Sequence, residues 1–194
     1  MAFADFLDLR TAVVEQVQKP DIVDVFPRLV FLAEANFNRR LRLKDQVTST
    51  TVTIASGTAS LPADFLAAIG LYDASGYEYV EQPLQAVKTS GTTAFFAISG
   101  GNIVTKMADG AKTLEYYAKI PTISGSMTAT NWLLTAAPAL YLYGVGLEAA
   151  KYARDAELSS AMSQILEQEY QAVLSQDESA RYSTVRVRLQ GNIA

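Results

Sequence analysis

Two kinds of hydrophobic spacing divide this sequence into three segments, and that division limits the folds open to it. Near both ends of the chain, apolar residues recur every three or four positions, as they do on one face of a helix. In the middle they alternate with threonine and other polar residues, as they do along a strand. Helical ends around a strand-rich middle predict an α+β protein in which both ends pack together.

The N-terminal segment predicts two helices. The first runs to about Val17 and is closed by Pro20, and the second begins near Pro27, because proline suits the first turn of a helix. The second helix is expected to end near Lys44. The apolar stripe of the first helix consists of Phe6, Leu9, Val13 and Val17.

The middle segment predicts several short strands. Thr48–Ile54 is rich in β-branched residues and alternates, and Tyr77–Val80 is a second short strand. Residues 66–72 and 84–89 fit more than one structure. The strongest local pattern is the turn Ser99-Gly100-Gly101-Asn102 between two apolar runs. With the run from Lys112 to Ile120 these predict a three-stranded antiparallel meander.

The C-terminal segment predicts two more helices and an extended tail. One helix runs from Pro138 to about Arg154, and its internal Gly144 and Gly146 indicate close approach by a neighbouring element. Asp155 is expected to cap a fourth helix that ends near Gln176. Beyond it, valine and leucine alternate with arginine, which is the pattern of a strand: Val185, Arg186, Val187, Arg188 and Leu189.

These elements predict an α+β fold with a four-helix bundle formed by both chain ends. An inserted antiparallel β-rich subdomain and an extended C-terminal tail complete it. The expected bounds are 1–46 with 130–178 for the helical core, 47–129 for the β-rich insertion and 179–194 for the tail.

The composition argues against catalysis. The chain has neither histidine nor cysteine, so Ser–His and Cys–His pairs and the usual zinc ligands are absent. Two carboxylate pairs are the remaining candidates for catalysis. Asp21 with Asp24 fits a helix start better, and Glu78 with Glu81 would face opposite sides of a strand. We therefore expect no enzyme, no cofactor and no metal.

Net charge and hydropathy limit the classes of partner that the protein is expected to bind. The formal net charge is −4, with 16 basic and 20 acidic residues, whereas duplex-DNA binders are usually strongly basic. An acidic surface is compatible with DNA that passes by without sequence-specific binding. No stretch approaches the roughly 20 apolar residues of a membrane span, and no secretory signal opens the chain. We expect no membrane partner.

Several segments in order resemble the head-to-tail adaptor family of tailed bacteriophages, also called tail tubular or gatekeeper-type connectors. The resemblance covers nearly the whole chain. It rests on Leu32–Arg42 (LAEANFNRRLR), Leu61–Phe65 (LPADF), Leu114–Pro121 (LEYYAKIP), Asn131–Leu134 (NWLL) and Leu140–Gly144 (LYLYG).

This resemblance implies a structural virion protein at the head-tail junction, made in the cytoplasm of an infected bacterium. It implies a ring, usually of twelve copies, that joins the portal protein to a downstream tail or nozzle protein. The ring would line the passage of genomic DNA during ejection. In such proteins the C-terminal segment commonly reaches into the portal.

Two basic groups are candidate contact sites. The first lies at the end of the second helix and consists of Arg39, Arg40, Arg42 and Lys44. These residues either compensate the helix dipole on a solvated surface or make an intersubunit or portal contact, and DNA contact is less favoured. The second group lies in the tail. The tail is either a disordered terminus or a strand that docks onto a sheet edge of the portal. Its expected portal-binding residues are Arg181, Tyr182, Val185, Arg186, Val187, Arg188 and Leu189.

Aromatic pairs in the β-rich segment support an alternative function. In Phe95-Phe96 and Tyr116-Tyr117, one ring of each pair should enter the core and the other should face outward. The outward rings would either pack ordinarily or seat a neighbouring protein. The alternative is therefore a tail or baseplate binding module whose β-insertion contacts another tail protein or a host glycan. The single tryptophan, Trp132, sits at a helix entrance and is expected to be buried, which disfavours a glycan platform.

Overall fold

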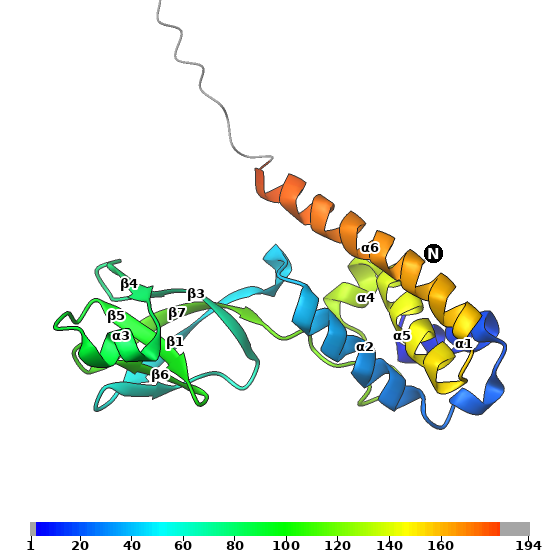
Figure 1. Cartoon of the computed structure of the whole chain (residues 1–194), viewed down its shortest axis with the longest axis horizontal. Coiled ribbons are helices and arrows are strands. Elements are labelled where there is room, and N and C mark those ends of the chain that lie inside the picture. Colours follow the sequence, from blue (N-terminus) through cyan, green and yellow to red (C-terminus); the bar gives the residue numbers. More distant parts are fainter. Residues whose placement is uncertain (1–2, 183–194) are drawn as a thin grey trace, which may run out of the picture. The chain divides into compact units, whose positions relative to one another are not determined.

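A computed structural model describes residues 3–182 of the chain as two compact units (Figure 1). The helical unit comprises Met1–Lys44 with Ile120–Ala194, and the β unit comprises Asp45–Lys119. The α+β class is confirmed, with six α-helices and one seven-stranded sheet in the described residues. The described part of the chain contains no helix that is both long and apolar enough to span a bilayer.

The helical unit begins with two helices whose ends follow local chemistry. Asp5 caps α1, because its Oδ1 accepts hydrogen bonds from the backbone N–H groups of Leu7 (3.0 Å) and Asp8 (3.1 Å). The helix ends at Gln18, which adopts the left-handed conformation. The elements of this unit are α1 (Phe6–Val17), η1 (Pro20–Ile22), α2 (Phe26–Arg40), α4 (Trp132–Ala136), α5 (Pro138–Tyr152) and α6 (Ala156–Tyr182), while η2 (Lys44–Gln46) lies at its boundary with the β unit.

The core of the helical unit is centred on α5. Helices α1, α2 and α6 each pack on α5, so elements from both ends of the chain share one core. The hydroxyl-bearing Tyr141 of α5 is fully buried and lies edge-on to Phe37 of α2, with 5.1 Å between ring centroids. A regular four-helix bundle is not confirmed, because the packing radiates from one central helix.

A neighbouring element does approach Gly144 closely, but with a side chain where backbone was expected. A Cβ built on Gly144 would lie 2.6 Å from Cζ of Phe37, which is closer than side chains pack. At Gly146 the nearest atom is Sδ of Met162, at an ordinary 3.4 Å. Gly144 therefore makes room for the Phe37 ring, while Gly146 makes no such demand.

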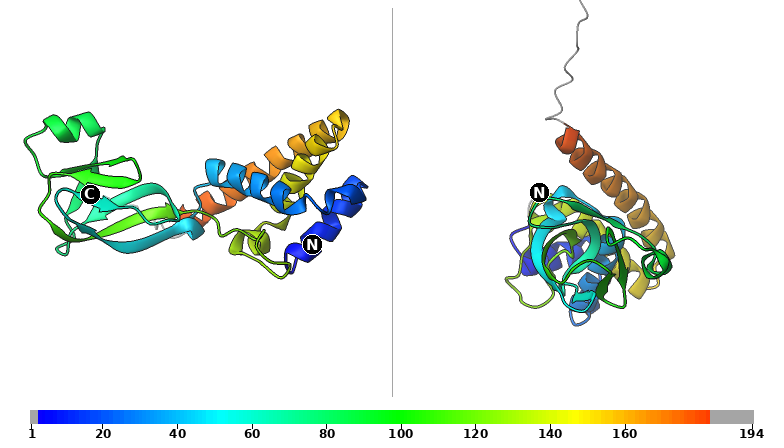
Figure 2. Two further views of the ribbon diagram at one scale, coloured as in Figure 1. Left: turned by 90° about the horizontal axis from the view of Figure 1, so that it is seen from below. Right: turned by 90° about the vertical axis from the view of Figure 1, so that its left-hand side faces the viewer.

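The β unit is a single curved sheet with the strand order β1-β7-β3-β4-β5-β6-β2. A bridge between Ala55 and Thr58 joins the end of β1 to β2, so the first and last strands of that order meet around the core (Figure 2). The short helix α3 (Leu84–Thr89) packs on β5 and β6. The strands are β1 (Val47–Ile54), β2 (Thr58–Ser60), β3 (Phe65–Tyr72), β4 (Glu78–Glu81), β5 (Phe95–Ser99), β6 (Asn102–Thr105) and β7 (Gly110–Ala118).

The predicted three-stranded meander is wrong in its third strand. Strands β5 and β6 do form an antiparallel hairpin around Gly100 and Gly101. However, β7 pairs with β1 and β3 instead of β6, and β4 pairs with β5 in parallel. A turn pattern reports only the two strands that it joins, whereas β7 is placed by pairing with strands more than 30 residues away.

The fourth helix is longer than predicted. Asp155 caps it as expected, with its Oδ1 accepting from the N–H of Leu158 at 2.9 Å. The helix then continues to Tyr182, so residues 179–182, which were predicted to open an extended tail, form its last turn. The remainder of that predicted tail, residues 183–194, lies outside the described residues.

Candidate functional site

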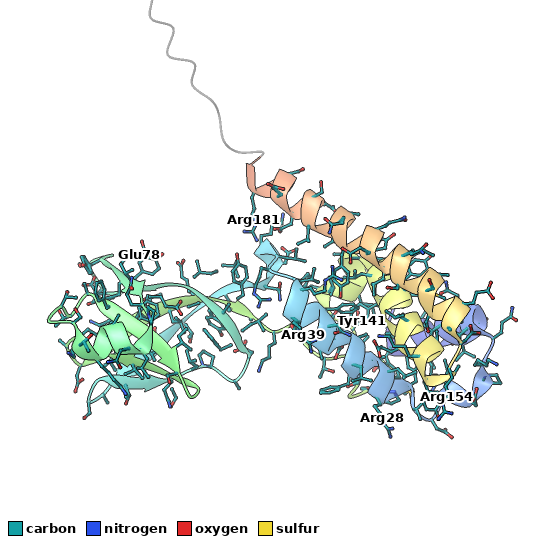
Figure 3. The ribbon with its side chains drawn as sticks, in the orientation of Figure 1. Arg28, Arg39, Glu78, Tyr141, Arg154 and Arg181 are labelled. Carbon is teal, nitrogen blue, oxygen red and sulfur yellow. The ribbon has the colours of Figure 1, made fainter. Side chains whose placement is uncertain are left out.

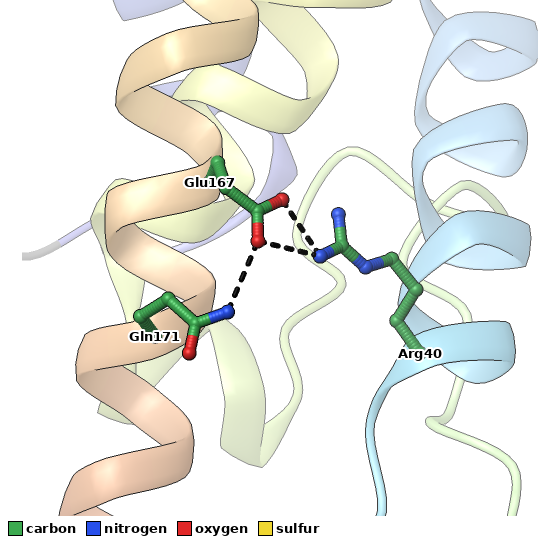
Figure 4. Close-up of polar contacts among 3 residues, drawn as sticks. All are labelled: Arg40, Glu167 and Gln171. Carbon is green, nitrogen blue, oxygen red and sulfur yellow. Dashed lines mark hydrogen bonds and ion pairs between the residues drawn. The ribbon is translucent and has the colours of Figure 1, made fainter.

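Arg40, the last residue of α2, contacts the acidic Glu167 of α6 (Figure 4). Its Nη2 donates to both carboxylate oxygens of Glu167, at 3.0 and 2.7 Å. Gln171 Nε2 also donates to Glu167, at 3.0 Å. The guanidinium carbon lies 3.9 Å from the ring centroid of Tyr170, in cation–π geometry. Arg40 therefore holds α2 and α6 together within one chain.

The ionised states of this contact fit its geometry. Hydrogen bonds from Arg40, and then from Gln171, lower the pKa of Glu167 below its ordinary value. Burial raises the pKa of Tyr170 to about 12. At neutral pH the contact therefore consists of a carboxylate, a guanidinium and a neutral phenol.

A second contact ties the last turns of α6 to the segment that follows α2. The backbone N–H of Lys44 donates to Asp177 Oδ1 at 2.8 Å, and Arg181 Nε donates to Asp177 Oδ2 at 2.6 Å. Arg181 Nη2 reaches the carbonyl oxygen of Arg42 at 2.8 Å. Arg42 itself donates to the carbonyl of Asn38 at 2.8 Å. These bonds anchor the end of α6 at the point where the predicted tail would leave the unit.

Arg181 of the second predicted group therefore lies next to Arg42 and Lys44 of the first group. The intersubunit and portal contacts themselves stay predictions. Of the predicted intersubunit residues, Arg40 and Arg42 bind within the chain, and Lys44 is held through its backbone. Arg39 is exposed and makes no ion pair with any residue in the described range (Figure 3). Of the predicted portal-binding residues, Arg181 and Tyr182 lie in α6, and the others, Val185, Arg186, Val187, Arg188 and Leu189, fall outside the described residues.

A buried acidic residue, which sequence reasoning missed, fixes the segment that returns from the β unit. Glu34 of α2 is only 4% exposed. Its carboxylate accepts hydrogen bonds from Thr122 Oγ1 (2.7 Å), the backbone N–H of Ile123 (2.9 Å) and Tyr141 Oη (3.1 Å). Burial raises the pKa of Glu34, and the three donors partly oppose that rise. The only advance signal was a charged residue on the apolar stripe of a helix.

Asn131 extends this network to the start of α4. Its side-chain amide donates to the carbonyl of Pro121 (2.6 Å) and to Tyr141 Oη (2.7 Å), and its Oδ1 caps α4 by accepting from Leu134 N–H (2.8 Å). Burial, followed by the charge of Glu34, raises the pKa of Tyr141, which therefore stays a neutral donor. Residues 120–134 are locked to α2 and α5 by these bonds.

The aromatic pairs of the β unit divide as expected. Tyr116 and Phe96 are buried, whereas Tyr117 and Phe95 are partly exposed. Tyr116 Oη donates to Asp64 at 3.0 Å, which joins β7 to the LPADF segment. Trp132, which was expected to be buried, is partly buried and packs against the helical core.

The carboxylate pairs considered for catalysis stay on open surface. Glu78 and Glu81 are exposed at the two ends of β4, and Asp21 and Asp24 are exposed before α2. Within residues 3–182, no three acidic side chains converge as metal ligands would. What the chain does build is a helical unit in which Glu34 ties the returning segment to α2 and Arg40 pairs α2 with α6.

The sequence matches a known protein family. The family model described as SU10 adaptor protein matches residues 4–188, nearly the entire chain. The chain belongs to this family. The SU10 adaptor proteins are a family of phage head-to-tail adaptors, so the resemblance seen in the motifs is confirmed. No curated protein matches the chain.

Membership in the SU10 adaptor family indicates a structural role at the head-tail junction of a virion. It implies a protein that works through partners at that junction and is not an enzyme. The residues that make these contacts fall in the family-like segments: Glu34 and Arg40 in LAEANFNRRLR, Asn131 in NWLL and Tyr141 in LYLYG.

Proposed function

We propose that this adaptor forms a ring of twelve copies that joins the portal to the tail and lines the passage of the genome. The match to a head-to-tail adaptor family over residues 4–188 is the observation that carries the proposal. The net charge of −4 supports a channel from which DNA is released rather than retained, because like charges repel.

The helical unit is suited to act as the rigid body of such a ring. Its core is shared by helices from both ends of the chain, and Glu34 ties the returning segment to α2 through three hydrogen bonds. A buried network with its members satisfied holds one arrangement rather than several. Subunits of fixed shape can then pack side by side with the same angle at every contact.

The β unit is the part proposed to meet the downstream tail or nozzle protein. Its exposed apolar side chains include Ile69, Tyr77 and Val80. Tyr77 and Tyr79 contact each other edge-on, with ring centroids 5.3 Å apart. Exposed aromatic and aliphatic residues of this kind anchor protein interfaces.

The portal is proposed to bind the C-terminal segment that follows α6. The alternation of valine and arginine from Val185 to Leu189 supports docking onto a sheet edge, where backbone bonds supply affinity. The anchoring of Arg181 by Asp177 and by the Arg42 carbonyl supports a firm base for that segment.

Truncation after Tyr182 tests the portal contact. This position spares the bonds of Asp177 and Arg181, so the helical unit should keep its circular dichroism and the fluorescence of Trp132. Binding to purified portal protein, measured by interferometry, should be lost. A matched full-length variant, Arg186→Ala with Arg188→Ala, should bind more weakly and with less salt dependence. Undiminished portal binding by the truncated chain would refute the proposed contact.

A further inference from the structure

The outward face of α2 has the composition of a protein interface. At 100° per residue, Arg28, Leu32, Ala35 and Arg39 fall within a narrow arc, with Phe31 beside them. Phe31 is 61% exposed and Leu32 is 42% exposed, although both are large and apolar. Figure 3 shows Arg28 and Arg39 along this helix. We call these five residues the α2 face.

The arginines of the α2 face have no acidic partner in the part of the chain that the structure describes. The ion pairs there involve Arg40, Lys151 and Arg181, and none involves Arg28 or Arg39. Even Asp24, one turn before Arg28, forms no ion pair with it. Aromatic residues and arginine are enriched at interfaces, where they supply most of the binding energy.

The outward face of α1 has the complementary composition. Asp8 and Glu15 are seven residues apart, so they lie on one side of the helix, with Thr11 between them, and all three are exposed. Leu7 is 42% exposed and Met127 is 50% exposed. The backbone bond from Leu7 N–H to Met127 O, at 3.1 Å, brings these two apolar residues together. We call these five residues the α1 face.

We propose that the α2 face of one copy binds the α1 face of a second copy. The inference rests on the proposed ring and names the surfaces that form it. Both faces belong to the same helical unit, and each pairs apolar side chains with charge. The charge is cationic on α2 and anionic on α1, where Arg10 lies at the Met127 edge of the face. Contact between two different surfaces is heterologous, and repeating it builds a closed ring when the rotation permits.

Charge also disfavours a two-fold symmetric contact between two identical faces. Two α2 faces would bring Arg28 and Arg39 against their own counterparts, and two α1 faces would oppose Asp8 and Glu15. Like charges across an interface are unfavourable, so the mixed contact is preferred over either two-fold contact. A single contact of this size is weak, and the ring gains stability from closing on a template.

Cysteine pairs test the contact directly, because the chain has no cysteine of its own. The full-length variant carrying Leu32→Cys and Thr11→Cys should give a ladder of disulfide-linked multimers on oxidation, in concentrated free protein and in the complex with portal. Each single-cysteine variant is the matched control and should stay monomeric on a denaturing gel. Dimers from Leu32→Cys alone would show a two-fold α2 contact and overturn the proposal. Absence of the ladder in both preparations would overturn it as well.

Charge reversal gives a second, independent test. One variant carries Arg28→Glu with Arg39→Glu, and the other carries Asp8→Lys with Glu15→Lys. Each alone should associate about tenfold more weakly than the native chain, because its two faces now carry the same sign. A mixture should recover association, since every contact in an alternating ring pairs opposite signs. Trp132 fluorescence confirms that both variants are folded.

The mixture separates this inference from the proposed function. Recovery by the mixture supports the α1–α2 contact whether or not the portal binds. Loss of portal binding in the Arg28, Arg39 variant with normal self-association would assign the α2 face to the portal instead. Loss of duplex-DNA binding alone would assign it to nucleic acid. Normal rings on the portal from each variant alone would overturn the inference and leave the adaptor role intact.

Discussion

Replacing Glu34 with alanine should destabilise the helical unit by removing the acceptor of three hydrogen bonds. Thr122 can turn its hydroxyl to Ser124, which lies 2.9 Å away. The N–H of Ile123 and the hydroxyl of Tyr141 lose their acceptor, and both bonds are buried. Each buried unsatisfied donor costs about 1–3 kcal/mol, so we expect a loss of about 3 kcal/mol.

Glutamine at position 34 is the informative comparison. Its amide oxygen can accept from Ile123 and Tyr141, as the carboxylate oxygen does now. Its amide nitrogen can donate to Thr122 Oγ1, whose own proton then turns to Ser124. Because every group keeps a partner, Glu34→Gln should cost less than about 1 kcal/mol. The exposed Glu15→Ala is the control for shortening a helical glutamate and should stay within about 0.5 kcal/mol.

Urea denaturation, monitored by tryptophan fluorescence, measures the stability of the helical unit in these variants. Trp132 is the single tryptophan of the chain and packs against the helical core. With a slope of about 2 kcal/mol/M, the alanine variant should lose about 1.5 M in its midpoint. A loss below about 1 kcal/mol, or equal losses for alanine and glutamine, would refute this account of Glu34.

The pH dependence of stability, compared between the native chain and Glu34→Gln, tests the raised pKa of Glu34. Burial raises the pKa of Glu34 in the folded protein above its ordinary value of 4.5, so the folded state binds this proton more tightly than the unfolded state. The stability contributed by protonation is complete below 4.5 and is lost as the pH rises through the folded pKa. The native chain should therefore lose stability relative to Glu34→Gln over that window. A difference that does not change with pH would contradict the raised pKa.

Two further predictions concern packing and the α2–α6 contact. Gly144→Ala should lower the free energy of unfolding by about 1–3 kcal/mol, because its Cβ would clash with the buried ring of Phe37. Gly146→Ala should be neutral or stabilising. The urea midpoints of the two variants test this difference. Arg40→Ala should return the pKa of Glu167 toward its ordinary value, as measured by NMR titration, and an unchanged pKa would show that Arg40 does not hold that carboxylate.

The helical ends of the fold were predictable because their signals are local. The stripe of α1 and the cap at Asp155 can be read from residues within a few turns. The glycines of α5 indicated a close approach, but its cause at Gly144 is Phe37 of the distant α2. The length of α6 was underestimated because the strand-like alternation after residue 184 was extended backwards over residues 179–182. Those residues are held in the helix by the bonds between Asp177, Arg181 and the segment after α2.

The sheet order and the contacts of Glu34 and Arg40 could not be predicted, because the residues that pair lie far apart in the sequence. Glu34 meets donors that lie 88 to 107 positions further along the chain, and Arg40 meets Glu167 across 127 positions. The helical spacing of α2 places Arg40 beside the apolar stripe and Arg39 on the opposite side, but it does not identify Glu167 as the partner of Arg40. The intersubunit contact expected of the basic cluster stays a prediction, whereas the structure shows which of its residues bind within the chain.

Electron microscopy of the full-length adaptor mixed with its purified portal tests the central claim most directly. The account predicts twelve copies in a ring stacked on the portal, with a central channel and with the β unit available to the tail. It also predicts that the free chain is a monomer or a small oligomer on sizing. Portal particles that stay bare at saturating adaptor, or that bind single scattered copies, would contradict the proposed role.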